Sequence, residues 1–143
     1  MRSLTIADLS IGDAAEFRKT ISESDVYLFA GITGDLNPVH VDEEFAKTTP
    51  FGARVAHGPL TFSLCAGLLG TELPGVGTIA VTNTVTYEAP VYIGDTIRVR
   101  VEIAALDAER NRATFAVTWH NQDGKQVASG LTVVKPPKVA VPL

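Results

Sequence analysis

The segment that most constrains the fold is the apolar stretch that follows His57-Gly58-Pro59. Its apolar residues fall on every side of a helical wheel, and they are Leu60, Phe62, Leu64, Cys65, Ala66, Leu68 and Leu69. A helix that is apolar on all sides is normally buried on most of its faces. Pro59 suits the first turn of such a helix, where its missing N–H is no loss. The sequence therefore predicts a central helix that ends at Gly70 or at Leu73-Pro74-Gly75.

Strands are the expected surroundings of this helix. After Gly77 the apolar residues recur with a period of two, and a shorter alternating segment lies near the N-terminus. We expect strands at residues 15–21, 78–87, 96–103, 114–120 and 126–135. In the second of these, Ile79, Val81, Val85 and Tyr87 should share one face. Clean alternation favours antiparallel strands with one covered face, so the predicted fold is α+β, an antiparallel sheet wrapped around the helix.

Two helix starts flank the segment with the most informative chemistry. Ser22-x-x-Asp25 resembles a capping box, and the helix that it opens should end near Gly34, which tolerates left-handed backbone. Asp42 should cap a second short helix over residues 43–47. The segment between these helices is predicted to be a loop.

This loop reads Gly34-Asp35-Leu36-Asn37-Pro38-Val39-His40. Pro38 fixes its own φ and pushes Asn37 toward extended backbone, so the loop is stiff. It can hold Asp35 and His40 toward one point, and a carboxylate beside an imidazole is a common acid–base pair. The alternative interpretation makes Asp35 a turn residue and His40 a satisfied, half-buried histidine. The spacing alone leaves both interpretations open.

Gly58, at the start of the apolar helix, is the second candidate. The N–H groups of a first helical turn lack partners within the helix, and a glycine lets a ligand oxygen approach the backbone closely. A developing oxyanion needs such donors. The alternative is an ordinary helix start. His57 is interpreted as structural, and Cys65 as an inert core thiol.

Composition excludes several classes of protein. Twelve Lys and Arg against 16 Asp and Glu give a net charge of −4, which disfavours general binding to nucleic acid. One cysteine permits no internal disulfide, and three scattered histidines favour no metal site. No apolar run reaches the roughly 20 residues of a membrane span, and no signal peptide is recognisable. We expect a cytoplasmic, soluble protein with one domain over residues 1–143 and a proline-rich tail at 136–143.

Three stretches together resemble the (R)-specific enoyl-CoA hydratases of the MaoC-like family. They are Phe29-Ala30-Gly31-Ile32-Thr33-Gly34-Asp35-Leu36-Asn37-Pro38-Val39-His40, Arg54-Val55-Ala56-His57-Gly58, and Tyr87-x-x-Pro90-Val91-x-x-Gly94-Asp95. The resemblance spans nearly the whole chain. It implies a hot-dog fold, a homodimer or higher even oligomer with the active site near the interface, and reversible hydration of trans-2-enoyl-CoA to (R)-3-hydroxyacyl-CoA.

The same resemblance assigns roles to individual residues. Asp35 and His40 match the catalytic pair, and Gly58 matches the residue whose backbone N–H binds the thioester oxygen. Asn37 is expected to orient the loop or the water. Some relatives carry a serine further along the helix, where this chain has Ala66, so Ser63, one turn earlier, is the candidate substrate-binding hydroxyl. No cofactor is implied, because coenzyme A is part of the substrate.

The anionic coenzyme A needs local basic groups, because the whole chain is acidic. Arg54 lies four residues before Gly58 and is the candidate phosphate contact, with Arg98 or Arg100 as helpers. The alternative for Arg54 is a surface salt bridge, and the strand arginines could be a solvated face.

Two other functions remain as alternatives. One is a hot-dog thioesterase or acyl-carrier dehydratase, and the other is a non-catalytic subunit that binds acyl-CoA. The preferred acyl chain length and the pathway, whether polyhydroxyalkanoate supply or fatty acid metabolism, are left open.

Overall fold

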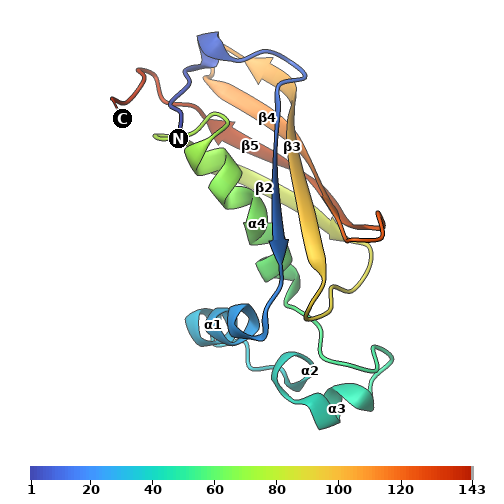
Figure 1. Cartoon of the computed structure of the whole chain (residues 1–143). Helices are drawn as coiled ribbons and strands as arrows, with labels where there is room; N and C mark the ends of the chain where they lie inside the picture. The colour runs from blue at the N-terminus through green and yellow to red at the C-terminus, as the bar shows by residue number, and fades with distance from the viewer. Residues whose placement is uncertain (143) are drawn as a thin grey trace.

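The computed structural model describes residues 1–142, which form one antiparallel sheet of five strands and a central helix (Figure 1). The strand order is β1-β3-β4-β5-β2, and neighbouring strands all run antiparallel. The helix α4 packs against one face of this sheet. The elements are η1 (Ile6–Asp8), β1 (Ala14–Thr20), α1 (Glu23–Thr33), α2 (Pro38–Val41), α3 (Glu43–Lys47), α4 (Gly58–Thr71), β2 (Ile79–Tyr87), β3 (Thr96–Asp107), β4 (Arg112–His120) and β5 (Gln126–Lys135).

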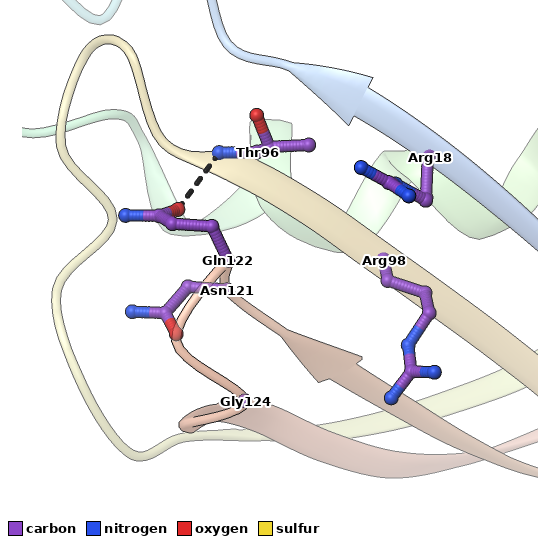
Figure 2. A pocket seen from close by; sticks show the side chains of 6 residues that line it. All are labelled: Arg18, Thr96, Arg98, Asn121, Gln122 and Gly124. Atoms are coloured by element: carbon purple, nitrogen blue, oxygen red, sulfur yellow. Dashed lines mark hydrogen bonds between the residues drawn. The ribbon is translucent and has the colours of Figure 1, made fainter.

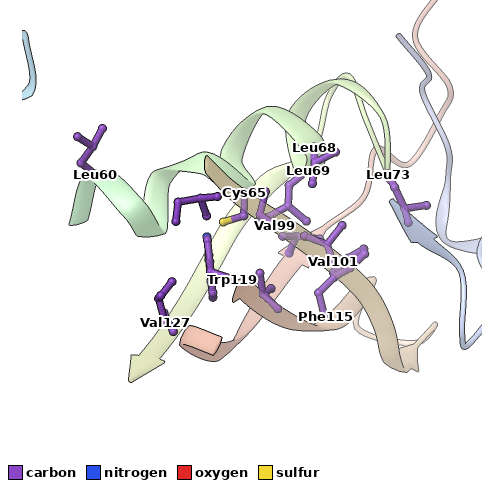
Figure 3. Close-up of a cluster of buried hydrophobic side chains, with 14 of the residues drawn as sticks. Leu60, Cys65, Leu68, Leu69, Leu73, Val99, Val101, Phe115, Trp119 and Val127 are labelled. Carbon is purple, nitrogen blue, oxygen red and sulfur yellow. The ribbon is translucent and has the colours of Figure 1, made fainter. Parts of the chain in front are cut away.

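The core fills the space between α4 and the sheet (Figure 3). Alternate residues of β3 and β4 point inward and are almost wholly buried, with Trp119 and Phe115 the largest. From α4 they meet a face that includes Cys65, Leu68 and Leu69. The predicted wrapping of a sheet around the apolar helix is thus confirmed. No helix within residues 1–142 combines the length and hydropathy needed to cross a bilayer.

The apolar helix is nevertheless not covered on every side in the single chain. Ala66, Gly67 and Gly70 are exposed, and Phe62 and Leu64 are only half-buried. The expectation of burial on most faces is therefore too strong for one chain. The open side leaves apolar surface available for further contacts.

Strand β2 differs from the expected alternation. A β-bulge between Ala80 and Thr82 inserts Val81 without a partner in β5 and reverses the faces of the residues beyond it. Val85 therefore lies on the helix side, opposite Gly130, whereas Ile79 lies on the other side, opposite the exposed Lys135. The prediction that Ile79 and Val85 share a face is wrong for this reason.

The helical segment before α4 follows the predicted caps. Ser22 and Asp25 exchange backbone and side-chain hydrogen bonds in a full capping box, and Gly34 ends α1 in the left-handed conformation with φ of 77°. Asp42 caps α3 as expected. The one difference is α2, a four-residue helix over part of the segment predicted to be a loop.

The proline-rich tail starts as a strap packed on the sheet. Pro136 and Pro137 are buried, and the carbonyl of Pro136 accepts a hydrogen bond from Asn111 Nδ2 at 2.8 Å. Further along, the Val141 N–H donates to Ser3 Oγ at 2.8 Å. Leu143 lies outside the described residues.

Candidate active site

The loop between α1 and α2 holds Asp35 by its own hydrogen bonds. Asp35 N–H donates to Thr33 Oγ1, and the Asn37 N–H donates to Asp35 Oδ1, both at 3.2 Å. Asn37 in turn caps α2, because its Oδ1 accepts from the Val39 N–H, and Pro38 occupies the first turn. This short helix places His40 in its last turn. The stiff loop of the sequence interpretation is therefore a loop followed by a single helical turn.

Asp35 and His40 face one another across a short gap. His40 Nε2 lies 4.0 Å from Asp35 Oδ2, and the two side chains are 12% and 49% exposed respectively. On the far side of the ring, His40 Nδ1 lies 2.7 Å from the Val55 carbonyl oxygen. Because a carbonyl only accepts, Nδ1 carries a proton, and Nε2 is the ring nitrogen that faces Asp35.

His57 supports both of these residues from inside the protein. It is fully buried, and its Nε2–H donates to the backbone carbonyl of Asp35 at 3.0 Å. Its ring packs on the His40 ring, with centroids 3.9 Å apart. The other nitrogen, Nδ1, has no hydrogen-bond partner within the described part of the chain. The structural role predicted for His57 is therefore to fix the positions of Asp35 and His40.

Gly58 opens α4 directly after this histidine. Neither its N–H nor that of Leu60 has an acceptor among residues 1–142, and Pro59 between them has no N–H. A Cβ at Gly58 would lie 2.9 Å from Cζ of Tyr87, so the ring of Tyr87 can occupy this position only because residue 58 has no side chain. The two free donors and the helix dipole favour a ligand oxygen at this point.

A cleft of about 500 Å³ is lined by His40 and Gly58, whereas Asp35 borders it only through His40 and Asn37. Asn37, His40 and Gly58 are among its lining residues, and Tyr87 from the end of β2 forms part of its wall. Burial raises the pKa of Tyr87, so its hydroxyl stays protonated. The remaining lining is mostly apolar and comes from Val39, Phe51, Val55, Ala56, Thr61, Glu88, Ala89, Pro90, Val91 and Val127. Such a site fits an extended ligand with one polar group.

Two candidate substrate contacts lie elsewhere. The Arg54 guanidinium is held by Glu23 at 2.6 Å and by Glu43 at 2.9 Å, and these carboxylates raise its pKa further. It does not line the cleft, so the salt-bridge alternative describes it. Ser63 Oγ donates to the Leu60 carbonyl of its own helix at 2.8 Å, and it borders a different hollow. Neither residue joins Asp35, His40 and Gly58.

Asp35, His40 and His57 bring three possible metal-ligand atoms within 4.8 Å of one another. Each imidazole, however, already uses one nitrogen to donate to a backbone carbonyl. The remaining atoms are one carboxylate, His40 Nε2 and the buried His57 Nδ1. The expectation of no metal stays a prediction.

The chain is similar in sequence to a known family and to characterised enzymes. Residues 8–124 match the family model described as MaoC like domain. The chain is 47% identical over 138 residues to the 3-hydroxybutyryl-CoA dehydratase of Methylorubrum extorquens, covering 96% of this chain and 87% of that protein. It is 45% identical over 130 residues to the (R)-specific enoyl-CoA hydratase of Rhodospirillum rubrum, covering 91% and 90%.

A solved structure agrees with these sequences. The (R)-hydratase from A. caviae involved in PHA biosynthesis superposes with a TM-score of 0.87 at 37% identity, covering 90% of this chain and 98% of that one.

Proposed function

Because the chain belongs to the MaoC-like domain family, we infer that it catalyses the reversible hydration of trans-2-enoyl-CoA to (R)-3-hydroxyacyl-CoA. The observation that carries this function is the 4.0 Å gap between Asp35 Oδ2 and His40 Nε2, because His40 lines the cleft together with Gly58. When the His40 ring is neutral, both facing atoms are acceptors. One water molecule between them can donate a hydrogen bond to each, which orients its oxygen lone pairs outward.

The proposed mechanism needs a base, a proton donor and an oxyanion site. As the water oxygen bonds to the β-carbon, its proton passes to the Asp35–His40 pair, and the electrons of the double bond move toward the thioester. Charge then develops on the thioester oxygen, where the Gly58 N–H and the dipole of α4 stabilise it. The pair returns a proton to the α-carbon, so protons balance over the cycle. Asn37 keeps Asp35 oriented throughout.

We also propose that no metal or separate cofactor takes part, because these groups already supply each function that hydration needs. Dialysis against a chelator should leave the hydration rate unchanged. A rate lost on dialysis and restored by a divalent cation would contradict this part of the proposal.

The test of the reaction uses crotonyl-CoA and two isosteric variants. Asp35→Asn and His40→Gln should each lower kcat by at least about 10²-fold, the typical loss of a general acid or base. The double variant should lose much less than the product of both losses, because both groups act on one water. Asp123→Asn, in an exposed turn, is the matched control. Near-normal turnover in either single variant would refute the assignment.

The product of the same assay separates the alternatives. A hydratase gives 3-hydroxybutyryl-CoA with the thioester intact, whereas a thioesterase releases the free thiol of coenzyme A. A non-catalytic subunit binds crotonyl-CoA without either product. An acyl-carrier dehydratase would require the carrier-linked thioester for comparable kcat/KM.

We propose further that the active form is a homodimer. β2 is an edge strand whose outer edge has no partner in the described chain, and its Ile79 and Val81 are 61% and 42% exposed. The adjoining side of α4 exposes Ala66. Unpaired apolar edges are usually covered in native proteins. Sedimentation should give twice 15.2 kDa, and a fully active monomer at micromolar concentration would refute this proposal. A cytoplasmic location and a role in polyhydroxyalkanoate supply also remain proposals, the latter supported by the A. caviae structure.

A further inference from the structure

Two arginines and a histidine form a row across the sheet face that points away from α4. Arg18 of β1 pairs directly with Arg98 of β3, and Arg98 pairs directly with His120 of β4. Arg98 alternates with Ile97 and Val99, which are both fully buried, so its own side chain is on the outer face. Like charges directly opposite on neighbouring strands repel, so this row is a local cost to the fold.

The two guanidiniums of this row are not neutralised by the protein. Arg54, Arg100 and Arg110 all form ion pairs with carboxylates. Arg18 and Arg98 form none with any of residues 1–142, although both are exposed.

Two carboxylates close to the row in sequence have other partners. Glu16, two residues from Arg18, binds Arg100 at 3.2 Å. Asp95 accepts hydrogen bonds from Gln122 Nε2 and from the Tyr92 N–H, each at 2.8 Å. The positive charge of Arg18 and Arg98 is therefore available to an external anion.

The row borders a hollow of about 320 Å³ (Figure 2). Figure 2 shows Arg18 and Arg98 side by side on one side of this hollow and the Asn121 and Gln122 amides on the other. The Gln122 amide already has a protein partner, because its Oε1 accepts a hydrogen bond from the Thr96 N–H at 3.0 Å. Asn121 Oδ1 accepts from the N–H groups of Asp123 and Lys125, and Figure 2 shows its Nδ2 on the side away from both arginines. The hollow thus offers two guanidiniums that pair with no carboxylate of residues 1–142.

We propose that this hollow is a second binding site, which takes a phosphate group between Arg18 and Arg98. Guanidinium donors match phosphate oxygens in geometry, and a bound dianion would replace the repulsion of the row with attraction. The site goes beyond the hydration reaction, because it shares no residue with the cleft that contains His40 and Gly58. Inorganic phosphate and the nucleotide end of coenzyme A offer the same chemistry.

The test compares Arg98→Gln with Arg110→Gln. Both variants remove one positive charge, but Arg110 is 83% exposed and paired with Asp107, away from the hollow. Inorganic phosphate should raise the Tm of wild type and of Arg110→Gln above that in chloride of equal ionic strength, because a ligand of the native state stabilises it. In Arg98→Gln this rise should vanish. Without phosphate, Arg98→Gln should unfold no more easily than wild type, because a repulsion has been removed.

Calorimetric titrations with two probes identify the source of the phosphate. The probes are inorganic phosphate and adenosine 3′,5′-bisphosphate, which lacks the thioester arm that the cleft would bind. The Kd of at least one probe should rise at least tenfold in Arg98→Gln and stay unchanged in Arg110→Gln. The probe whose Kd rises in Arg98→Gln identifies the kind of phosphate that the site binds. If neither probe binds wild type, or both bind the two variants equally, the site does not exist. The hydration assay of Asp35→Asn and His40→Gln tests the proposed function separately.

Discussion

Adding one methyl group at Gly58 tests the oxyanion site more sharply than removing a catalytic side chain. In Gly58→Ala the new Cβ would lie 2.9 Å from Tyr87 Cζ and 3.1 Å from both Cε atoms, so the ring has to move. Tyr87 is 48% exposed at the end of the edge strand β2, so it can swing toward solvent. The methyl group then occupies the approach to the Gly58 N–H.

Stability and activity should separate in this variant. Overpacking costs about 1–3 kcal/mol where the surroundings are rigid, and less where one side chain is free to move. Alanine in a helix gains up to about 1 kcal/mol over glycine. The free energy of unfolding should therefore change by no more than about 1 kcal/mol. In contrast, kcat/KM for crotonyl-CoA should fall by about 10²–10³-fold, as for the loss of an oxyanion donor.

Gly67 provides the matched control within the same helix. A Cβ there meets nothing within 4 Å, so Gly67→Ala should be stabilised by about 0.5–1 kcal/mol and keep its kcat/KM. Urea unfolding and steady-state hydration measure both quantities. A wild-type kcat/KM for Gly58→Ala would refute the placement of the thioester oxygen at this N–H.

Three further predictions concern the fold. Trp119→Phe should cost less than about 2 kcal/mol, because the buried Nε1 of Trp119 has no hydrogen-bond partner to lose among residues 1–142; urea unfolding followed by circular dichroism measures this. Burial raises the pKa of Cys65 to about 11, so iodoacetamide at pH 8 should label it only in urea, as mass spectrometry would show; rapid labelling of the native protein would contradict its burial. Although burial alone would raise the pKa of Asp25, hydrogen bonds from Ser22 and the ion pair with Lys19 hold it below the ordinary 3.8. Asp25→Asn should thus destabilise the fold at pH 7, and the difference should shrink as pH falls below 3.8; a difference that is constant between pH 7 and pH 3 would refute this linkage.

Features set by neighbouring residues could be predicted from the sequence. The cap at Ser22, the left-handed end at Gly34 and the start of α4 at Gly58 depend on interactions within a few residues, and all three are confirmed. The pairing of Asp35 with His40 could also be predicted from the sequence, since one helical turn after Pro38 brings the two side chains together.

Features set by distant residues could not be predicted. Arg54 is neutralised by Glu23, 31 residues away, and by Glu43, 11 residues away. No pattern of neighbouring residues predicts either ion pair. The bulge at Val81 depends on how β2 meets β5, not on the alternation of β2 itself. The support that His57 gives to Asp35 spans 22 residues, and a lone histidine before a helix does not signal it.

The placement of α1, α2 and α3 beyond one end of the sheet (Figure 1) divides the active site between two parts of the fold. His40 comes from this helical segment, whereas Gly58 belongs to the central helix. The segment joins the rest of the protein through the buried Val26, through the hydrogen bonds of His57 to Asp35 and of His40 to Val55, and through backbone hydrogen bonds such as Ile21 N–H to Asp95 O. Its amide hydrogens should therefore exchange with solvent through a partial opening that leaves the sheet folded. A thioester bound to both parts would close that opening, so substrate would slow exchange in α1 to α3 and leave β3 and β4 unchanged.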